Sequence, residues 1–452
     1  MKISKKILAA GCLAIISLSG LTSCEKTGFK VGLICLHGQN SSYDNNFIQA
    51  FEKACQEEGL TEGANHNGYE IRTDVAEDYN KIYTAAKEWA EDGYSMIFSD
   101  SFGHQYGLFD VAKEYPTTVF CHATGTFAVG NPLKNYHTAF ADIYQGRYLA
   151  GVLAGEKLYK DYVANGCPNE TIKIGYVGAM PYAEVISGYT SFYLGVCSVF
   201  DKHSLNRPEM VVRYTNSWYD YQAEYEAAKT LILQEGCKLI SQHADSYGAP
   251  KACEDNNIPN ISYNISTKKE CKNTYLGGSK INWRPYFIQA IRDAREVYHD
   301  GARDGQHGAY LNPDYTAGFS NIDNEKVDLY DEDNSIQLLE FSDEMEEYSD
   351  EIIDIATELR DGGKEVFDVN TFTVKNCKRG GFEMDSDGHL TKCLADIDGD
   401  YVPEENVIKH KSDGSITFFA ESDYDAYAVG EANPLRSAPY FDLIIDGITT
   451  LN

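Results

Sequence analysis

The stretch Lys30-Val-Gly-Leu-Ile-Cys-Leu36 is a short apolar run, and an amphipathic stretch from Asn46 to Glu58 follows it. The first pattern is typical of a buried strand and the second of a helix that covers it. The same alternation continues along the chain, with a helix predicted at 79–91 and strands at 69–75, 94–99, 118–121 and 136–141. Alternating strands and helices predict a parallel sheet covered on both faces.

The alternation starts again near residue 172, which predicts a second α/β lobe. Strands are expected at 172–177, 211–214, 238–242 and 260–263, and helices at 184–200, 222–234 and 250–255. A strand at 274–276 and a helix at 285–298 then predict a return to the first lobe, which would make a hinged clamshell. We therefore assign residues 24–142 and 265–305 to an N-terminal lobe, and 143–264 and 306–452 to a C-terminal lobe.

Beyond about residue 300 the chain becomes acidic and irregular. A helix is expected at 343–360, with the acids of Asp343–Glu351 on a solvated face, and hairpins are expected to turn at Asp387-Gly388 and Asp413-Gly414. The run Asp396–Asp400 is a poor match to a calcium loop, because Tyr401 stands at the required glycine and Val407 at the twelfth position. A tight polar turn is the better interpretation.

Residues 1–23 have the pattern of a lipoprotein signal peptide, with lysines ahead of an apolar core and Leu21-Thr22-Ser23-Cys24 at its end. The core is too short to span a bilayer. We expect a mature chain that begins at Cys24, carries lipid there, and stands on the extracytoplasmic face of the cell membrane with no other membrane contact.

The composition excludes some partners. The formal charge is −30, removal of residues 1–23 takes away three lysines and no acid, and no dense basic cluster follows, so no nucleic acid partner is expected. The remaining cysteines form no CxxC pair, and no phosphate loop, GxSxG elbow or HExxH motif occurs. We therefore expect no metal, no cofactor and no enzyme activity; Cys377 with Cys393 is the one disulfide pairing to consider.

Polar runs directly follow several predicted strands, where ligands bind in open parallel sheets. In the first lobe these are Leu36 to Phe47, Ser99-Asp-Ser-Phe-Gly103 and His122-Ala-Thr-Gly125; in the second they are Tyr214 to Asp220 and Cys237 to Ser246. Trp218 and Asp245 are expected to face one crevice, opposite Asp100 and Phe102. Both aspartates are equally suited to capping the helices that follow them.

Colinear segments between about Lys30 and Tyr298 resemble the BMP family, the PnrA-like substrate-binding lipoproteins of ABC importers. They include SYDNNFIQAFEKA, IFSDSFG, FCHATGT, ADIYQGRYLAGVLAG, TNSWYDYQAEYEAAKTLI, ISQHADSYGAP and INWRPYF. The resemblance implies a type I periplasmic-binding-protein fold: two Rossmann-like lobes that close on a small solute, commonly a purine nucleoside or nucleobase. An irregular acidic C-terminal elaboration would be added to this fold. It also implies ABC permease subunits as partners and a monomeric receptor.

The resemblance further implies that two aromatic rings hold the base, at positions that correspond to Phe47 and Trp218. A family acid that contacts the base corresponds to His122, an acid near the ribose to Asn264, and a lysine to Trp283. These departures remove hydrogen bonds that a ribose would make, so a free base or another flat heterocycle remains open. Phe47 could equally be a core residue, His122 a structural hydrogen bonder, Asn264 a turn residue and Asn45 a helix cap.

Two other functions remain open from the sequence. A sensor subunit would deliver the closed clamshell to a signalling partner instead of a permease. A cell-envelope enzyme would use Asp100, His122 and Asp245 as acid/base groups, although no nucleophile accompanies them.

Overall fold

The computed structural model describes residues 28–124, 133, 135–299, 318–321, 323–377, 380–395, 402, 405–406, 408–410, 416–418 and 443–451. The predicted signal peptide, Cys24 and the Asp396–Asp400 turn lie outside these residues. Within the described part of the chain, no helix is both long and apolar enough to cross a membrane.

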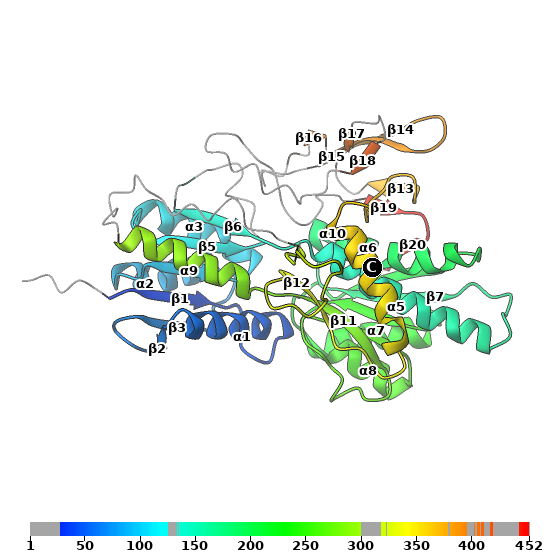
Figure 1. The fold of residues 1–452 in the computed structure, drawn as a ribbon, viewed down its shortest axis with the longest axis horizontal. Coiled ribbons are helices and arrows are strands. Elements are labelled where there is room, and N and C mark those ends of the chain that lie inside the picture. Colours follow the sequence, from blue (N-terminus) through cyan, green and yellow to red (C-terminus); the bar gives the residue numbers. More distant parts are fainter. Residues whose placement is uncertain are drawn as a thin grey trace, which may run out of the picture.

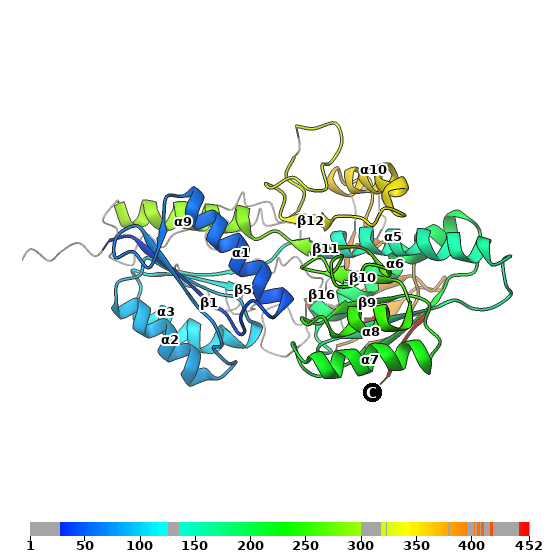
Figure 2. The same cartoon turned by 90° about the horizontal axis from the view of Figure 1, so that it is seen from below.

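The first lobe is built on a six-stranded parallel sheet in the order β2-β3-β1-β4-β5-β6. Its strands are β1 (Lys30–Ile34), β2 (Thr61–Glu62), β3 (Gly68–Arg72), β4 (Met96–Ser99), β5 (Val119–Ala123) and β6 (Tyr136–Ala139). Figure 2 shows α1 (Ser42–Glu57) and α9 (Arg284–His299) on one face of the sheet, and α2 (Tyr79–Glu91) and α3 (Gln105–Glu114) on the other.

The second lobe is built on a seven-stranded sheet in the order β12-β11-β10-β9-β7-β8-β20. Its strands are β7 (Lys173–Gly178), β8 (Glu209–Tyr214), β9 (Ile240–His243), β10 (Asn260–Tyr263), β11 (Tyr275–Ile281), β12 (Ile336–Leu339) and β20 (Ile448–Leu451). Among these described strands, only β12 runs antiparallel to its neighbour. The two lobes lie side by side along the long axis (Figure 1), which confirms the predicted two-lobe α/β architecture.

The helices of the second lobe are α5 (Ile143–Ala164), α6 (Ala183–Lys202), α7 (Tyr221–Leu233) and α8 (Gly248–Asn256). The first two pack closely because glycines meet where they cross. A Cβ on Gly151 of α5 would lie 2.1 Å from the Phe192 carbonyl oxygen of α6, and a Cβ on Gly195 of α6 would lie 2.1 Å from the Tyr148 carbonyl oxygen. Any side chain at either position would push these helices apart.

The return to the first lobe differs from the sequence prediction. Residues 275–281 form β11, which pairs with β10 in the second sheet, so the chain crosses back after Ile281 and not after Asn264. The crossover is held from both sides: Asn46 of α1 donates a hydrogen bond to the Ile281 carbonyl oxygen (2.7 Å), and the Asn282 side chain donates to the carbonyls of Glu332 and Asn334. The apolar run alone could not reveal which sheet it joins, because both sheets bury such runs.

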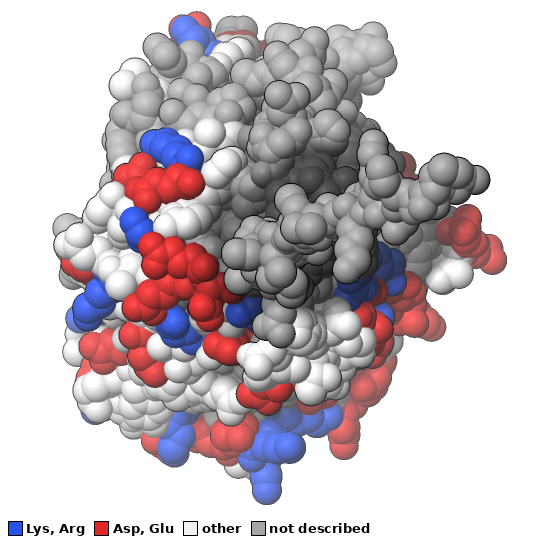
Figure 3. Space-filling view, turned by 90° about the vertical axis from the view of Figure 1, so that its left-hand side faces the viewer, with Lys and Arg blue, Asp and Glu red and all other residues white. Residues whose placement is uncertain are grey.

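Ion pairs fix α9 to α1 in the first lobe. Arg284 contacts Glu57 at 2.6 Å, and Arg292 and Arg295 contact Glu58 at 2.8 and 3.0 Å. Figure 3, which views the first lobe end-on, shows acidic and basic side chains interspersed over the described part of that face.

The acidic C-terminal elaboration packs on the second lobe. The predicted helix begins later than expected, as a 3-10 turn at Glu346–Tyr348 followed by α10 (Ser349–Arg360). Its acids are not simply solvated, because Glu344, Glu347 and Glu351 pair with lysines of α5 and α6 at 3.1, 2.7 and 2.7 Å.

Short antiparallel pairs follow α10. They are β13 (Val374–Cys377) with β19 (Leu443–Ile445), β14 (Phe382–Met384) with β15 (Leu390–Ala395), β15 with β16 (Glu405–Asn406), and β17 (Ile408–His410) with β18 (Ile416–Phe418). The β14–β15 pair confirms the predicted turn at Asp387-Gly388, where Gly388 has φ 87°. The strand β20 then adds to the edge of the second sheet beside β8.

Candidate functional site

A small cleft lies between the lobes at the carboxyl ends of the strands, the position where open parallel sheets bind ligands. Residues of both lobes line it: Leu36, Tyr43, Asp44, Ser101, Phe102, Thr124, Glu184, Trp218, His243 and Asp245. The described side chains leave a cavity of about 20 Å³ between them. That is the size of about one water molecule.

The first turn of α1 supplies the first-lobe wall. The helix begins at Ser42, one residue after its N-cap Ser41, whose hydroxyl accepts a hydrogen bond from the Asp44 amide. This start places Tyr43 and Asp44 directly at the strand ends. The Tyr43 hydroxyl donates to the Asp100 carbonyl oxygen (2.7 Å), which ties the helix to the end of β4.

The second-lobe wall combines aromatic and acidic groups. The Asp245 amide donates to the Trp218 carbonyl oxygen (2.9 Å), so the loops after β8 and β9 hold each other. Glu184, in the first turn of α6, lies with a carboxylate oxygen 3.3 Å from His243 Nε2. The ring of Tyr182 lies between those of Phe102 and Trp218, at 5.5 and 5.9 Å between centroids, and links the two walls.

Direct contacts close the cleft. The Ser42 amide of the first lobe donates to the Asp245 carbonyl oxygen of the second at 2.7 Å. The rings of His37 and Tyr219 approach to 5.3 Å across the same boundary. Small-molecule pockets are typically about 300–1,000 Å³. The structure is therefore a closed form, and a solute of any size needs the lobes to part or the wall to rearrange.

The buried acids of the cleft differ in the direction in which their pKa values are shifted. Burial alone would raise the pKa of Asp44, but hydrogen bonds from His37 and Ser41 outweigh it and lower that pKa. Burial, followed by the nearby Asp44 carboxylate, raises the pKa of Asp100 well above its ordinary value. Burial and the same carboxylate raise the pKa of Asp245 in the same way. The cleft thus combines Asp44, whose pKa is lowered, with two acids whose pKa values are raised.

A buried cation lies behind the second-lobe wall. Arg147 of α5 is 1% exposed, donates to the Gln242 carbonyl oxygen (2.7 Å), and places its guanidinium 3.3 Å from the centre of the Tyr263 ring. Burial and this arginine lower the pKa of His243 to about 4, so the ring facing Glu184 is neutral at neutral pH. A neutral imidazole can both donate and accept a hydrogen bond.

Several predicted site residues do line the cleft. These are Phe102, Trp218 and Asp245. Two others lie just behind it: Asp100, whose Oδ1 accepts a hydrogen bond from the Leu36 amide (3.1 Å), and His122, whose Nε2 is 2.7 Å from the Ser101 carbonyl oxygen.

The structure differs from the prediction at Phe47 and Trp283. Both are buried in the first-lobe core, where their rings stack on each other at 4.4 Å, and Phe47 also packs on Phe98 at 5.8 Å. Because α1 begins four residues earlier than expected, Phe47 sits one turn farther from the strand ends and points into the core. Tyr43 occupies the cleft position that the resemblance led us to give to Phe47.

Asn45 and Asn264 also lie away from the cleft wall. The Asn45 side chain accepts from Gln49 of the next turn of α1 (3.2 Å), and Ser41, not Asn45, caps the helix. Asn264 adopts φ 63° just after β10, and its backbone N–H donates to the Ser279 carbonyl oxygen (3.0 Å). That left-handed turn matches the turn interpretation of Asn264.

Sequence reasoning missed Tyr43, Asp44, Glu184 and His243 as site residues. A usable signal existed for three of them, which lie in the polar runs that follow predicted strands; Glu184 had none, since it heads the helix predicted at 184–200. Tyr43 and Asp44 belong to the quoted run from Leu36 to Phe47, and His243 to the run from Cys237 to Ser246. Choosing among the residues of each run required the helix start, which the polar run does not show.

Comparisons with known proteins agree with this arrangement. A family model described as "ABC transporter substrate-binding protein PnrA-like" matches residues 37–295. A purine-binding protein of Brucella abortus is 34% identical over 208 residues, 46% of this chain and 53% of that protein. A putative ABC transporter glucose-binding protein of Haloferax volcanii is 32% identical over 216 residues, 48% of this chain and 49% of that protein.

The chain spans about half the length of these curated relatives. Among solved structures, an ABC transporter solute-binding protein from Conexibacter woesei has a TM-score of 0.51 at 18% identity, covering 75% of this chain and 98% of that one. This likeness shows the periplasmic-binding-protein type I fold. With more than half of its residues matched by the family model, the chain belongs to the PnrA-like family of ABC transporter substrate-binding proteins.

Proposed function

We propose that this protein is the extracytoplasmic solute-binding protein of an ABC importer, and that it captures a purine base or nucleoside between its lobes. The cleft itself carries this proposal, because Tyr43 and Phe102 of one lobe and Trp218 of the other surround a set of buried acids. Aromatic rings offer flat apolar contact to a purine, and polar groups around them read its edge. The purine-binding relative supports the same ligand class.

The opposite pKa shifts of the acids suit a purine edge, which presents both donors and acceptors. The lowered pKa of Asp44 favours a carboxylate that accepts from an amino or hydroxyl group, whereas the raised pKa of Asp245 favours a carboxyl group that donates to a ring nitrogen. None of the described residues that line the cleft is a lysine or arginine. A phosphate group would meet the carboxyl groups of Asp44, Glu184 and Asp245 there without a cation to balance it, so the site should favour bases and nucleosides over nucleotides.

The small cavity fits capture by closure. A purine cannot enter about 20 Å³ of space, so it must bind a more open form and draw the lobes together through contacts with both walls. The closing contacts between Ser42 and Asp245 and between His37 and Tyr219 lie at the rim of this space. The protein then acts as a non-enzymatic receptor, tethered by lipid on Cys24, that presents the closed clamshell to a permease.

A sugar is the second candidate ligand, because one relative is named as a putative glucose-binding protein. Carboxylates that accept hydrogen bonds from paired hydroxyls, flanked by aromatic rings, would also hold a hexose. Both candidate ligands would use the same aromatic rings and carboxyl groups, so direct binding measurements with each ligand class separate them.

Thermal unfolding of the mature protein with a panel of solutes tests the proposal. Adenine, guanine and their nucleosides should raise the melting temperature, since a ligand at a hundredfold excess over its dissociation constant stabilises the native state by about 2.7 kcal/mol. The matching nucleotides should do so far less. A shift with glucose and none with any purine would instead establish the sugar. Mass spectrometry of solute released by denaturation gives an independent identification.

A further inference from the structure

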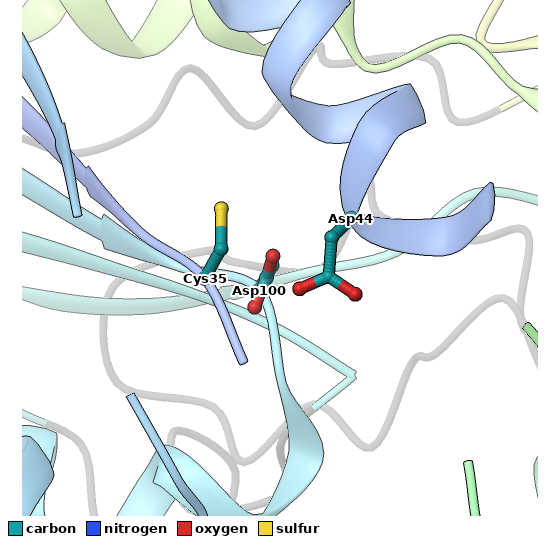
Figure 4. Close-up of side chains that lie close together, drawn as sticks. All are labelled: Cys35, Asp44 and Asp100. Atoms are coloured by element: carbon teal, nitrogen blue, oxygen red, sulfur yellow. The ribbon is translucent and has the colours of Figure 1, made fainter. Parts of the chain in front are cut away.

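Three buried side chains converge beneath the first-lobe wall, although they lie far apart in the sequence. Cys35 follows β1, Asp100 follows β4, and Asp44 lies in the first turn of α1. The strands β1 and β4 are parallel neighbours, so their ends bring Cys35 and Asp100 together. One ligand atom of each of the three residues lies within 4.8 Å of the other two. Figure 4 shows the three side chains close together.

The carboxyl of Asp100 is incompletely satisfied within this cluster. The residue is 0% exposed and its Oδ1 accepts from the Leu36 amide, but no described residue donates a well-formed hydrogen bond to Oδ2. A buried carboxyl oxygen without a partner is costly. The Cys35 thiol and the Asp44 carboxyl are its side-chain neighbours, and a cation shared by all three residues would satisfy it.

The neighbouring groups do not supply a balancing cation. Asp44 is 1% exposed, with one oxygen accepting from the His37 amide (2.7 Å) and the other from the Ser41 hydroxyl (2.6 Å), which leaves further lone pairs on both. The nearest basic group in the described chain that contacts these carboxyls is His37, whose Nδ1 lies 3.5 Å from Asp44 Oδ2. No lysine or arginine of the described residues forms an ion pair with Asp44 or Asp100.

We propose that Cys35, Asp44 and Asp100 form a binding site for a divalent transition-metal ion of the zinc class. The sulfur ligand disfavours Ca²⁺ and Mg²⁺, which prefer all-oxygen sites, whereas Zn²⁺ accepts mixed thiolate and carboxylate ligands. Three protein ligands leave a fourth position to water or to a donor from the cleft. The ion would bind the ends of β1 and β4 to the start of α1, the turn that carries Tyr43.

This site does not depend on the identity of the solute. It escaped sequence inspection because its ligands have no motif spacing, and only the sheet order unites them. The cysteine is the informative ligand, since a bound Co²⁺ ion gives a near-ultraviolet thiolate-to-metal charge-transfer band only if sulfur coordinates it. Surface carboxylates, which are abundant in this acidic chain, bind Co²⁺ without that band.

The experiment titrates chelator-treated mature protein with Co²⁺ in a Cys167→Ser background, because Cys167 is exposed and could bind metal by itself. One equivalent of Co²⁺ should produce the band, and Zn²⁺ should abolish it by displacement. Cys35→Ala should remove the band, whereas Cys121→Ala, which removes an equally buried thiol from β5 of the same sheet, should retain it. Asp100→Asn should weaken Zn²⁺ binding by more than the roughly 10- to 100-fold that is typical when an outer-shell partner is lost, and the exposed neighbour Asp74→Asn should not weaken it.

A missing band in the parent protein, or a band that survives Cys35→Ala, overturns the metal site. If Cys35→Ala is unfolded by circular dichroism, Cys35→Ser replaces it, and the Asp100→Asn titration tests the same site through a second ligand. Purine binding is measured on the same chelated samples. Purine binding that persists while no metal binds would refute this inference alone, and loss of purine binding with an intact band would refute only the proposed ligand.

Discussion

Exchanging single aromatic residues for alanine should separate the core of the first lobe from the ligand site. Phe47 is 0% exposed and packs against the rings of Trp283, Tyr43 and Phe98 at 4.4, 4.8 and 5.8 Å. A Phe→Ala change in such a core costs about 3–5 kcal/mol. At about 2–4 °C per kcal/mol for a unit the size of one lobe, Phe47→Ala should lower the melting temperature by roughly 6–20 °C.

Trp218→Ala should act on binding instead. Its ring lines the cleft, is partly exposed, and contacts the ring of Tyr182 at 5.9 Å. Loss of a stacking ring costs on the order of 1–3 kcal/mol of affinity, a factor of about 5–150 in the dissociation constant. Its melting temperature without solute should fall less than that of Phe47→Ala, because the Trp218 ring is only partly buried, although it packs against the core.

The assay pairs calorimetric titration of a purine with differential scanning calorimetry of the same samples. In the native fraction of Phe47→Ala, purine affinity should be within a few fold of the wild-type value. The reasoning is refuted if Phe47→Ala melts like the wild type yet loses affinity, or if Trp218→Ala collapses the melting transition and leaves affinity intact. The first outcome would return the stacking role to Phe47, and the second would make Trp218 a core residue.

Three further predictions concern pH, the C-terminal strand and closure. Burial raises the pKa of Glu224 from 4.5 to about 7, so its contribution to stability is present below about pH 4.5 and is lost as pH rises through about 7. Glu224→Gln should therefore flatten the pH dependence of the free energy of unfolding in this range, as measured by urea melts. An unchanged slope would contradict this prediction. Ile448 is fully buried in β20, so Ile448→Ala should lower the free energy of unfolding by about 2–5 kcal/mol in urea melts. Thr449→Ala, at its exposed neighbour, should change that free energy by no more than about 0.5 kcal/mol. Equally small costs for the two variants would show that β20 contributes no core packing. Saturating purine should reduce the radius of gyration in small-angle scattering, and an identical profile would mean that the free protein is already closed.

The sequence by itself was sufficient for the architecture. Apolar runs such as Lys30–Leu36, alternating with amphipathic stretches, predict parallel sheets because burial on both faces requires continuous apolar strands. Turn chemistry at Asp387-Gly388 likewise located a hairpin that the structure contains. Polar runs after the strands pointed to the edge of each sheet where the cleft lies, and Trp218 and Asp245 of these runs line it. These patterns depend only on residues close together in the sequence, so they can be recognised without knowing the tertiary contacts.

Only the tertiary structure decided which side chains of a polar run line the cleft and which lie in the core. Tyr43 and Phe47 lie one helical turn apart on the same face of α1, and the start of the helix at Ser42 puts the first in the cleft and the second in the core. The strand β11 could have joined either sheet, because its apolar pattern suits both. Cys35, Asp44 and Asp100 meet only because β1 and β4 are adjacent and α1 begins above their ends. Such choices depend on contacts between distant segments, which a local pattern of residues does not encode.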